Sequence, residues 1–239
     1  MKLIFIPALL STLVLTSCRF VEGRHIQGDG DLTKEQRSVS TFTGVETHGS
    51  INIVVTPGDF KVVAESDRNI LPYIVTEVQN NILVVSFKEG FNGYNFTSAT
   101  VYVTAPALAV FKTRGSGNIK SAGKFSGGNK SEISVGGSGD IKLEINSPVI
   151  DADISGSGNI TLAGEAKDFT SEINGSGDMH AFDLNAENVR SSVHGSGNTE
   201  ISASVKLDAE IFGSGDVKYK GSPQVNSSIH GSGAVKQRG

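Results

Sequence analysis

The sequence predicts an all-β protein, most of which is a parallel β-solenoid with coils of about 19 residues. The triplet Gly-Ser-Gly occurs seven times between residues 115 and 233, at intervals of 18 to 22 residues. A short, nearly fixed period of this kind is typical of solenoids. Apolar and polar residues alternate on both sides of each triplet, and this period of two residues is typical of a strand. No repeat contains a run long enough for a helix, and the 29 Gly of the 239 residues disfavour one.

Residues 1–17 resemble a bacterial lipoprotein signal peptide. A basic start at Lys2 precedes an apolar run over residues 3–15. This run is too short to span a bilayer comfortably but suits the apolar region of a secretory signal. Cys18, the single Cys of the chain, ends the segment where a lipoprotein carries the Cys that is lipidated and becomes the mature N-terminus. The alternative is an ordinary signal peptide followed by an unrelated Cys.

Residues 18–37 are polar, mixed in charge and without apolar periodicity. This composition predicts a flexible tether between the lipid and the folded part of the chain. The tether would keep the folded part close to the membrane without burying it there.

For residues 38–110 the sequence predicts a β-rich N-terminal part that lacks the regular Gly-Ser-Gly repeat. Short strands are expected over 61–64, 73–78, 82–87, 100–104 and 109–113. Gly49-Ser50 looks like one degenerate copy of the later Gly-Ser-Gly corner. Two interpretations stay open: longer, irregular coils of the same solenoid, or a sheet that caps its open end. The 66 residues from Gly49 to Gly115 would make about three coils, which favours continuity slightly.

Residues 111–239 predict the repeat solenoid. Each repeat is expected to form a strand, a Gly-Ser-Gly corner, a second strand and a return. Stacking would place like residues about 4.8 Å apart and create a continuous inner column. Gly suits the corner because it accepts positive φ without a Cβ clash. The corner column of first glycines is Gly115, Gly137, Gly156, Gly175, Gly195, Gly213 and Gly231.

The residue that follows each triplet alternates between an amide and an acid. The six positions are Asn118, Asp140, Asn159, Asp178, Asn198 and Asp216. If all were Asp, stacked carboxylates would repel one another at about 5 Å. Each Asn can instead donate to the neighbouring Asp, so we interpret the column as a stability device. A calcium ladder is the functional alternative, but half of its ligands would be neutral.

Composition and motifs disfavour several functions. The net charge is −4 at pH 7. The chain therefore lacks the excess of basic residues that is typical of nucleic-acid-binding proteins. One Cys excludes a disulfide framework and a Cys-rich metal site. No Gly-x-Ser-x-Gly, P-loop or His-Glu-x-x-His motif is present. We therefore expect no cofactor, no metal ion and no catalytic residue.

Two constellations leave an enzymatic or metal-binding alternative. His48, His194 and His230 share the outward position just before the corner. The last two would lie about 9.6 Å apart, too far to share a metal, so solvated residues are the simpler interpretation. A pectate-lyase-like β-helix would need an acidic calcium site beside a basic catalyst. The outward neighbours Asp153 and Glu172, and the pair Lys120 and Lys142, do not form such a cluster.

One motif before the repeats identifies a resemblance. It reads Arg37-x-Val39-x-x-Phe42-x-x-Val45-x-x-x-Gly49-Ser50-x-x-Ile53, and the Gly-Ser-Gly-Asn/Asp repeats follow. Over about residues 38–225 the chain resembles the head GIN domain family of auto-transporter adhesins. The resemblance implies a β-helical fold and an adhesin, fits a lipoprotein signal, and brings no catalytic residues.

These expectations combine into a lipid-anchored, extracytoplasmic β-solenoid of the bacterial cell envelope, at the outer membrane. Its expected partners are the membrane, through the lipid, and a surface glycan or protein bound by an outer sheet face. The alternatives are a structural envelope protein without a ligand and a polysaccharide lyase. A second copy of the chain is a further expected partner at the C-terminal coil, unless the charges of Lys236 and Arg238 protect that strand edge.

Overall fold

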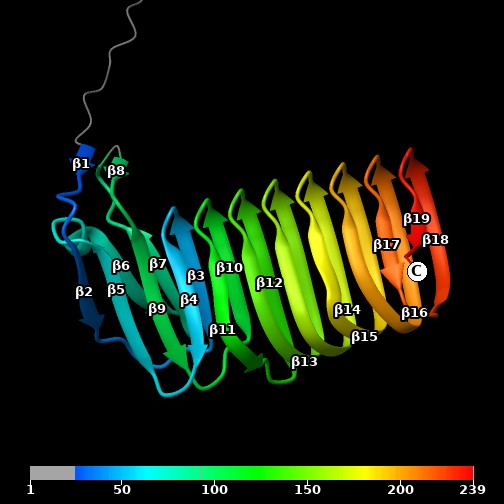
Figure 1. Ribbon diagram of the computed structural model, residues 1–239, viewed down its shortest axis with the longest axis horizontal. Helices are drawn as coiled ribbons and strands as arrows, with labels where there is room; N and C mark the ends of the chain where they lie inside the picture. The colour runs from blue at the N-terminus through cyan, green and yellow to red at the C-terminus, as the bar shows by residue number, and fades with distance from the viewer. Residues whose placement is uncertain (1–24, 92, 239) are drawn as a thin grey trace, which may run out of the picture.

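The computed structural model describes residues 25–91 and 93–238. Within them the chain is almost entirely β-structure, with one turn of 3₁₀ helix at Leu71–Tyr73. The strands stack along one long axis, and their corners form a row at one edge of the stack (Figure 1). The predicted β-solenoid is confirmed. Cys18 and the predicted signal peptide lie outside the described residues.

In the described part of the chain, no helix is both long enough and apolar enough to cross a membrane.

The repeat solenoid differs from the prediction in how a coil returns. Its strands are β10 (Val110–Gly115), β11 (Ile119–Ser126), β12 (Lys130–Gly137), β13 (Ile141–Gly156), β14 (Ile160–Gly175), β15 (Met179–Gly195), β16 (Thr199–Gly213), β17 (Val217–Lys220), β18 (Gln224–Gly231) and β19 (Val235–Gln237). Each of β13 to β16 runs 15 to 17 residues from one corner to the next. The expected second strand and return are therefore one bent strand in these coils. Register shifts in the pairing of β14 with β15 and of β15 with β16 absorb the differences in coil length.

Near the corners, the core is made of two columns of inward-facing side chains. One column stands two residues before the first corner glycine and the other stands four residues after it. Ile154 and Ile160 show the pattern, and each is fully buried. Thr113 occupies the same inner column, where its hydroxyl donates to the carbonyl of Gly117 at 2.6 Å. A polar residue is thus tolerated in the column because its hydrogen bond is made locally.

The N-terminal part begins with one true coil and ends in a cap. β3 (Gly44–Gly49) and β4 (Asn52–Pro57) lie in register with β10 and β11, so Gly49 pairs with Gly115. β7 (Ile82–Phe87) and β9 (Ala99–Ala105) continue the parallel stack on the side of β3 and β4 that faces away from β10 and β11. β5 (Lys61–Asp67) and β6 (Ile74–Gln79) then pair antiparallel with β9 and β7. The 66 residues between the two corners are an excursion that builds this cap, so the interpretation as three coils is wrong.

The predicted flexible tether is also wrong over residues 25–37. β1 (His25–Gln27) pairs with β8 (Gly93–Asn95), and β2 (Leu32–Arg37) pairs antiparallel with β5. The segment has no apolar periodicity because β2 is an edge strand with polar side chains, as edge strands often are. The carboxylate of Asp67, fully buried, accepts hydrogen bonds from the backbone of Gly30 and of Thr97 at 2.8 and 2.7 Å. Specific polar contacts therefore order this segment.

The last described coil has an open side. β18 pairs with β16 and is exposed along its whole length. Ile229 belongs to the inner column, but 42% of its surface is exposed because no described strand covers it. Pairing of this edge with a second copy of the chain stays a prediction. Sedimentation velocity of the full chain at rising concentration checks it, and a strict monomer would contradict it.

Candidate functional site

The corner column is a structural element in which both glycines of each triplet are required. Gly156 adopts φ +138°, which favours glycine. A Cβ on Gly158 would collide with the carbonyl oxygen of Gly139 in the preceding coil, although its φ is ordinary. The backbone N–H groups of Ser157 and Gly158 both donate to the carbonyl of Gly137, at 2.9 and 3.1 Å. The serine side chain points to solvent, so the repeat preserves backbone contact rather than a reactive hydroxyl.

The Asn/Asp column forms a continuous ladder of hydrogen bonds. The side-chain amide of Asn159 donates to the Asp140 carboxylate at 2.9 Å, as expected from the alternation. A second set of bonds does not follow from the alternation. Each side-chain oxygen also accepts the backbone N–H of the same position in the next coil, for example from Asp178 to Asn159 at 3.0 Å. The ladder begins earlier than predicted, at Asn52, which accepts from the backbone of Asn118 at 3.0 Å.

These bonds use one side-chain oxygen at each position of the column, so a calcium ladder would have to compete with them. Among the described residues, no group of three or more His, Cys, Asp or Glu side chains is arranged to hold a metal ion. The signal for Asn52 is present in the sequence, since it stands three residues after Gly49 as Asn118 stands after Gly115. The column is therefore explained by coil stacking.

Asn159→Asp is expected to destabilise the protein more at pH 7 than at pH 4. The change replaces an amide donor with a carboxylate and creates three acidic side chains in successive coils. Repulsion and the lost hydrogen bond should cost about 1–2 kcal/mol at pH 7. Near pH 4, which is close to the ordinary pKa of Asp, part of the repulsion disappears. Thermal unfolding at both pH values checks this, and an equal loss at both would contradict the interpretation.

A long groove runs over the face formed by the strand segments that lead into the corners. Outward side chains stand in two rows, one three residues and the other five residues before each first corner glycine. We call the hollow lined by these two rows the outer groove. It consists of three adjoining hollows of about 560, 480 and 560 Å³. Neighbouring hollows share lining residues, so the groove is continuous along the solenoid axis. The two rows are Lys112, Ser134, Asp153, Glu172, Ser192, Glu210, Ser228 and Val110, Glu132, Asp151, Thr170, Arg190, Asp208, Asn226.

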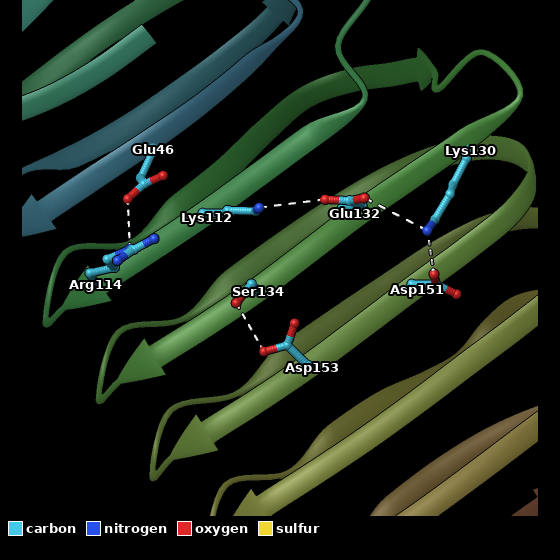
Figure 2. A network of polar contacts seen from close by, with 8 residues as sticks. All are labelled: Glu46, Lys112, Arg114, Lys130, Glu132, Ser134, Asp151 and Asp153. Atoms are coloured by element: carbon cyan, nitrogen blue, oxygen red, sulfur yellow. Dashed lines mark hydrogen bonds and ion pairs between the residues drawn. The ribbon is translucent and has the colours of Figure 1, made fainter. Parts of the chain in front are cut away.

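The half of the groove nearest the cap is occupied by its own ion pairs (Figure 2). Lys112 contacts Glu132 at 3.4 Å, and Lys130 contacts Asp151 at 2.8 Å. Each pair bridges adjacent coils. The Arg114 guanidinium pairs with Glu46 at 2.7 Å next to the same row. Exposed pairs of this kind add little stability, but they neutralise each other and leave few free partners for a ligand.

Asp153 lies in the middle of the groove, where burial raises the pKa of its carboxyl group. The Ser134 hydroxyl donates a hydrogen bond to this carboxylate at 2.9 Å, which lowers the pKa. The negative charge of Glu172 raises the pKa further. A carboxyl group whose pKa is raised by folding lowers stability once the pH is high enough to ionise it. The ionised form at neutral pH is thus a cost that the fold tolerates at this position.

Asp153→Asn is expected to raise the Tm at pH 7 by about 2 °C and to leave it nearly unchanged near pH 3.5. The amide keeps an acceptor for Ser134 and removes the buried charge. The lower pH is below the ordinary pKa of about 3.9, so Asp153 is mostly protonated in both the folded and the unfolded chain and most of the advantage disappears. Thermal unfolding of the two proteins at both pH values checks this. A Tm that falls at pH 7 would show that the carboxylate stabilises the fold.

The half of the groove nearest the C-terminus has charged side chains with few internal contacts, although the Asn174 amide donates a hydrogen bond to Glu172 at 2.9 Å. No ion pair within the described residues engages Glu172, Arg190 or Glu210. Asp208 is engaged: Lys206 contacts it at 2.6 Å and the Asn226 amide donates to it at 2.9 Å, and both bonds lower its pKa. This half of the groove is therefore the part best able to bind a ligand.

An aromatic stack borders the same half of the groove. His194 and His230 are separated by the ring of Phe212, with ring centroids 4.9 and 4.8 Å apart. The sequence placed the two histidines outward and two coils apart, but it missed the phenylalanine at the same position of the intervening coil. Phe212 is 38% exposed, although parallel packing covers its faces. The stack thus presents ring edges beside the row that contains Glu210.

The lyase-like constellation is not assembled. Asp153 and Glu172 are neighbours in the row before the corner. Lys120 and Lys142 are neighbours on the strand segments after the corner. None of the three hollows of the outer groove includes either lysine.

Comparison with known proteins agrees with the β-solenoid fold. A family model described as "Putative auto-transporter adhesin, head GIN domain" matches residues 41–223. The chain belongs to this family. The match includes the β3–β4 coil, the capping strands β5, β6, β7 and β9, and six of the seven Gly-Ser-Gly corners, so the head GIN domain comprises both the cap and the solenoid. A search of curated proteins found no match.

Solved structures share the head GIN domain fold. A putative adhesin from Bacteroides fragilis is 24% identical, with a TM-score of 0.83 over 89% of this chain and 100% of its own. A putative adhesin from Parabacteroides distasonis is 29% identical, with a TM-score of 0.71 over 90% of this chain and 100% of its own. A protein from the same species, described as a putative lipid binding protein, is 23% identical with a TM-score of 0.74, over 90% of this chain and 100% of its own.

Proposed function

We propose that the protein is an adhesin of the bacterial cell envelope that binds a surface polymer, either glycan or protein, through the outer groove. The continuity of the groove across successive coils carries this proposal. Each coil repeats the same outward positions, so an extended polymer would meet a series of similar contacts. Many weak contacts in a series give strong attachment without a deep pocket. Membership of an adhesin family supports this function.

We also propose that a lipid on Cys18 holds the protein at the outer membrane. The apolar segment over residues 3–15, ending at the single Cys, supports this anchor. Only six residues separate Cys18 from β1, which begins at His25. Because an extended residue spans at most about 3.6 Å, the cap would lie within roughly 25 Å of the anchor. The solenoid would then be presented close to the membrane surface.

Cys18→Ala is expected to release the protein from the membrane fraction. One lipidated Cys supplies the apolar attachment that the polar outer face of the solenoid lacks. Fractionation and antibody labelling of intact cells measure membrane attachment and surface exposure. Wild type should be membrane-bound and labelled on intact cells, and the variant should lose both properties. Labelling only after permeabilisation would contradict an adhesive role at the cell surface, and full retention of the variant would contradict the anchor.

Three other functions are less well supported. A structural envelope protein would give no reason for the unpaired charges near the C-terminal end of the groove. A polysaccharide lyase would need the separated lysine and acidic pairs to act together, and release of unsaturated products from pectin would support it. A lipid-binding role, as named for one structural relative, fits poorly with a groove lined by charged and hydroxyl side chains.

A further inference from the structure

We propose that the half of the outer groove nearest the C-terminus binds an uncharged glycan whose chain lies along the solenoid axis. This inference deepens the proposed adhesin function and rests on it. The site, called the distal groove, is the hollow of about 560 Å³ between the outward rows of β14, β15, β16 and β18. Its outward side chains are Thr170, Glu172, Arg190, Ser192, Asp208, Glu210, Asn226 and Ser228.

The distal groove offers both kinds of hydrogen-bonding partner that a sugar hydroxyl needs. A hydroxyl group donates one hydrogen bond and accepts others. Glu172 and Glu210 are exposed carboxylates that only accept, whereas the exposed guanidinium of Arg190 only donates. Each of these three groups is free of ion pairs within the described residues. They can therefore bind hydroxyls without first breaking an internal salt bridge.

The backbone beneath the groove favours a glycan over an extended peptide. The segments Asp168–Gly175, Asn188–Gly195, Lys206–Gly213 and Gln224–Gly231 pair in one parallel ladder. A peptide lying across this face cannot add a strand, because its backbone would meet side chains rather than a free sheet edge. Its own N–H and carbonyl groups would be left to scattered side chains. Sugar hydroxyls do not need a continuous backbone partner.

The charge of the groove selects against acidic polymers. The distal groove contains three carboxylates, on Glu172, Asp208 and Glu210, against the single cation of Arg190. The Lys206 ammonium lies beside Asp208 at 2.6 Å and already compensates one of the three. An anionic polysaccharide would therefore approach a surface of its own sign, which slows association and weakens binding. A neutral chain avoids this repulsion.

The direction of the glycan follows from the repeat. Equivalent positions in successive coils are about 4.8 Å apart, so four coils present a track of roughly 14 Å between the first and last row members. The stack of His194, Phe212 and His230 runs parallel to this track, next to Glu210. The exposed ring edge of Phe212 supplies apolar surface for the C–H groups of sugar rings, while the charged rows bind their hydroxyls.

Binding of the full chain to defined polymers tests the inference. The protein is purified in a detergent without a sugar headgroup and titrated with neutral glucan, mannan and galactan. Polygalacturonate and an oligo-lysine peptide are tested in parallel as an anionic and a cationic polymer. We expect at least one neutral polysaccharide to bind and polygalacturonate not to bind. Failure of all three neutral polysaccharides, or preference for either charged polymer, would overturn the inference.

Substitutions then locate the site. The double variant Arg190→Gln, Glu210→Gln should weaken binding of the neutral polysaccharide by about tenfold or more. The matched control Lys167→Gln, Glu165→Gln removes the same two charges from exposed positions outside the groove and should bind as wild type does. Unchanged Tm values show that both variants fold. If the groove variant binds like the control, the distal groove is not the site.

The outcome separates this inference from the proposed adhesin function. Binding of oligo-lysine or polygalacturonate that the groove variant abolishes would overturn the uncharged glycan but keep the adhesive groove. If the protein binds none of the polymers and is also absent from the surface of intact cells, both the glycan inference and the proposed adhesin function are overturned. Neutral-glycan binding that depends on Arg190 and Glu210 supports both.

Discussion

Gly177→Ala is expected to lower the Tm by about 10 °C, corresponding to a loss of more than about 3 kcal/mol. A Cβ on Gly177 would collide with the carbonyl oxygen of Gly158 in the preceding coil and would lie 2.9 Å from Cγ2 of Ile154. That carbonyl belongs to a corner whose backbone is held by hydrogen bonds, so it cannot move away without breaking them. The coil would have to separate from its neighbour at the corner.

The adjacent position supplies the control for this prediction. Ser176→Ala changes an exposed side chain in the same corner and should leave the Tm within about 2 °C of wild type. Thermal unfolding of both variants, followed by circular dichroism, makes the comparison. If Gly177→Ala unfolds at the same temperature as Ser176→Ala, close backbone stacking at the corner does not limit stability.

Asp67→Ala is expected to destabilise the cap by about 3 kcal/mol. The buried carboxylate accepts from the backbone of Gly30 at 2.8 Å, from the backbone of Thr97 at 2.7 Å and from the Thr97 hydroxyl at 3.0 Å. Truncation removes the one acceptor that these three donors share and leaves a gap at a residue that is itself fully buried. Because Asp67 connects the segment before β2 with the segment before β9, loss of the contact should release both. Limited proteolysis should then cut near residue 30 in the variant before it cuts wild type.

The effect of Asp67 depends on pH in a defined direction. Its hydrogen bonds, that from the Thr97 backbone first, hold the pKa of the carboxyl group below its ordinary value. Its stabilising contribution is therefore complete above the ordinary pKa of about 3.9 and is lost as the pH falls through the lowered value. The difference in Tm between wild type and Asp67→Ala should shrink below pH 3. The variant Asp67→Asn, which keeps one acceptor, should fall between the two, and a Tm equal to wild type would show that the charge does not matter.

The sequence predicted those parts of the fold in which a local pattern repeats. The corners follow from Gly-Ser-Gly and the inner columns follow from alternation, because the solenoid places each residue over its equivalent in the next coil. β2 was missed because its polar residues carry no periodic signal and its partner, β5, is antiparallel and distant in sequence. Asp67 was missed for a similar reason, since its bonding partners at Gly30 and Thr97 come from separate segments of the cap.

The candidate site was predicted only in outline. The repeat pattern predicts that an outer sheet face binds the partner, and it places Asp153 and Glu172 as outward neighbours. The groove itself depends on the register of successive coils, which aligns Arg190 with Asp208 and Glu172 with Ser192. It also depends on which charges already pair with each other, as Lys112 does with Glu132. Side-chain pairing across coils of unequal length cannot be read from spacing alone.

Attachment of whole cells tests the outer groove as an adhesive surface most directly. Three kinds of cell are compared: cells that produce wild type, the groove double variant Arg190→Gln with Glu210→Gln, or the control double variant Lys167→Gln with Glu165→Gln. The cells are placed on surfaces coated with neutral polysaccharide, polygalacturonate or oligo-lysine. Antibody labelling first shows that equal amounts of protein reach the cell surface. We expect wild type and control cells to attach to the neutral polysaccharide, and the groove variant to retain about a tenth of that attachment. Full attachment of the groove variant at equal surface amounts would contradict the outer groove as the binding surface.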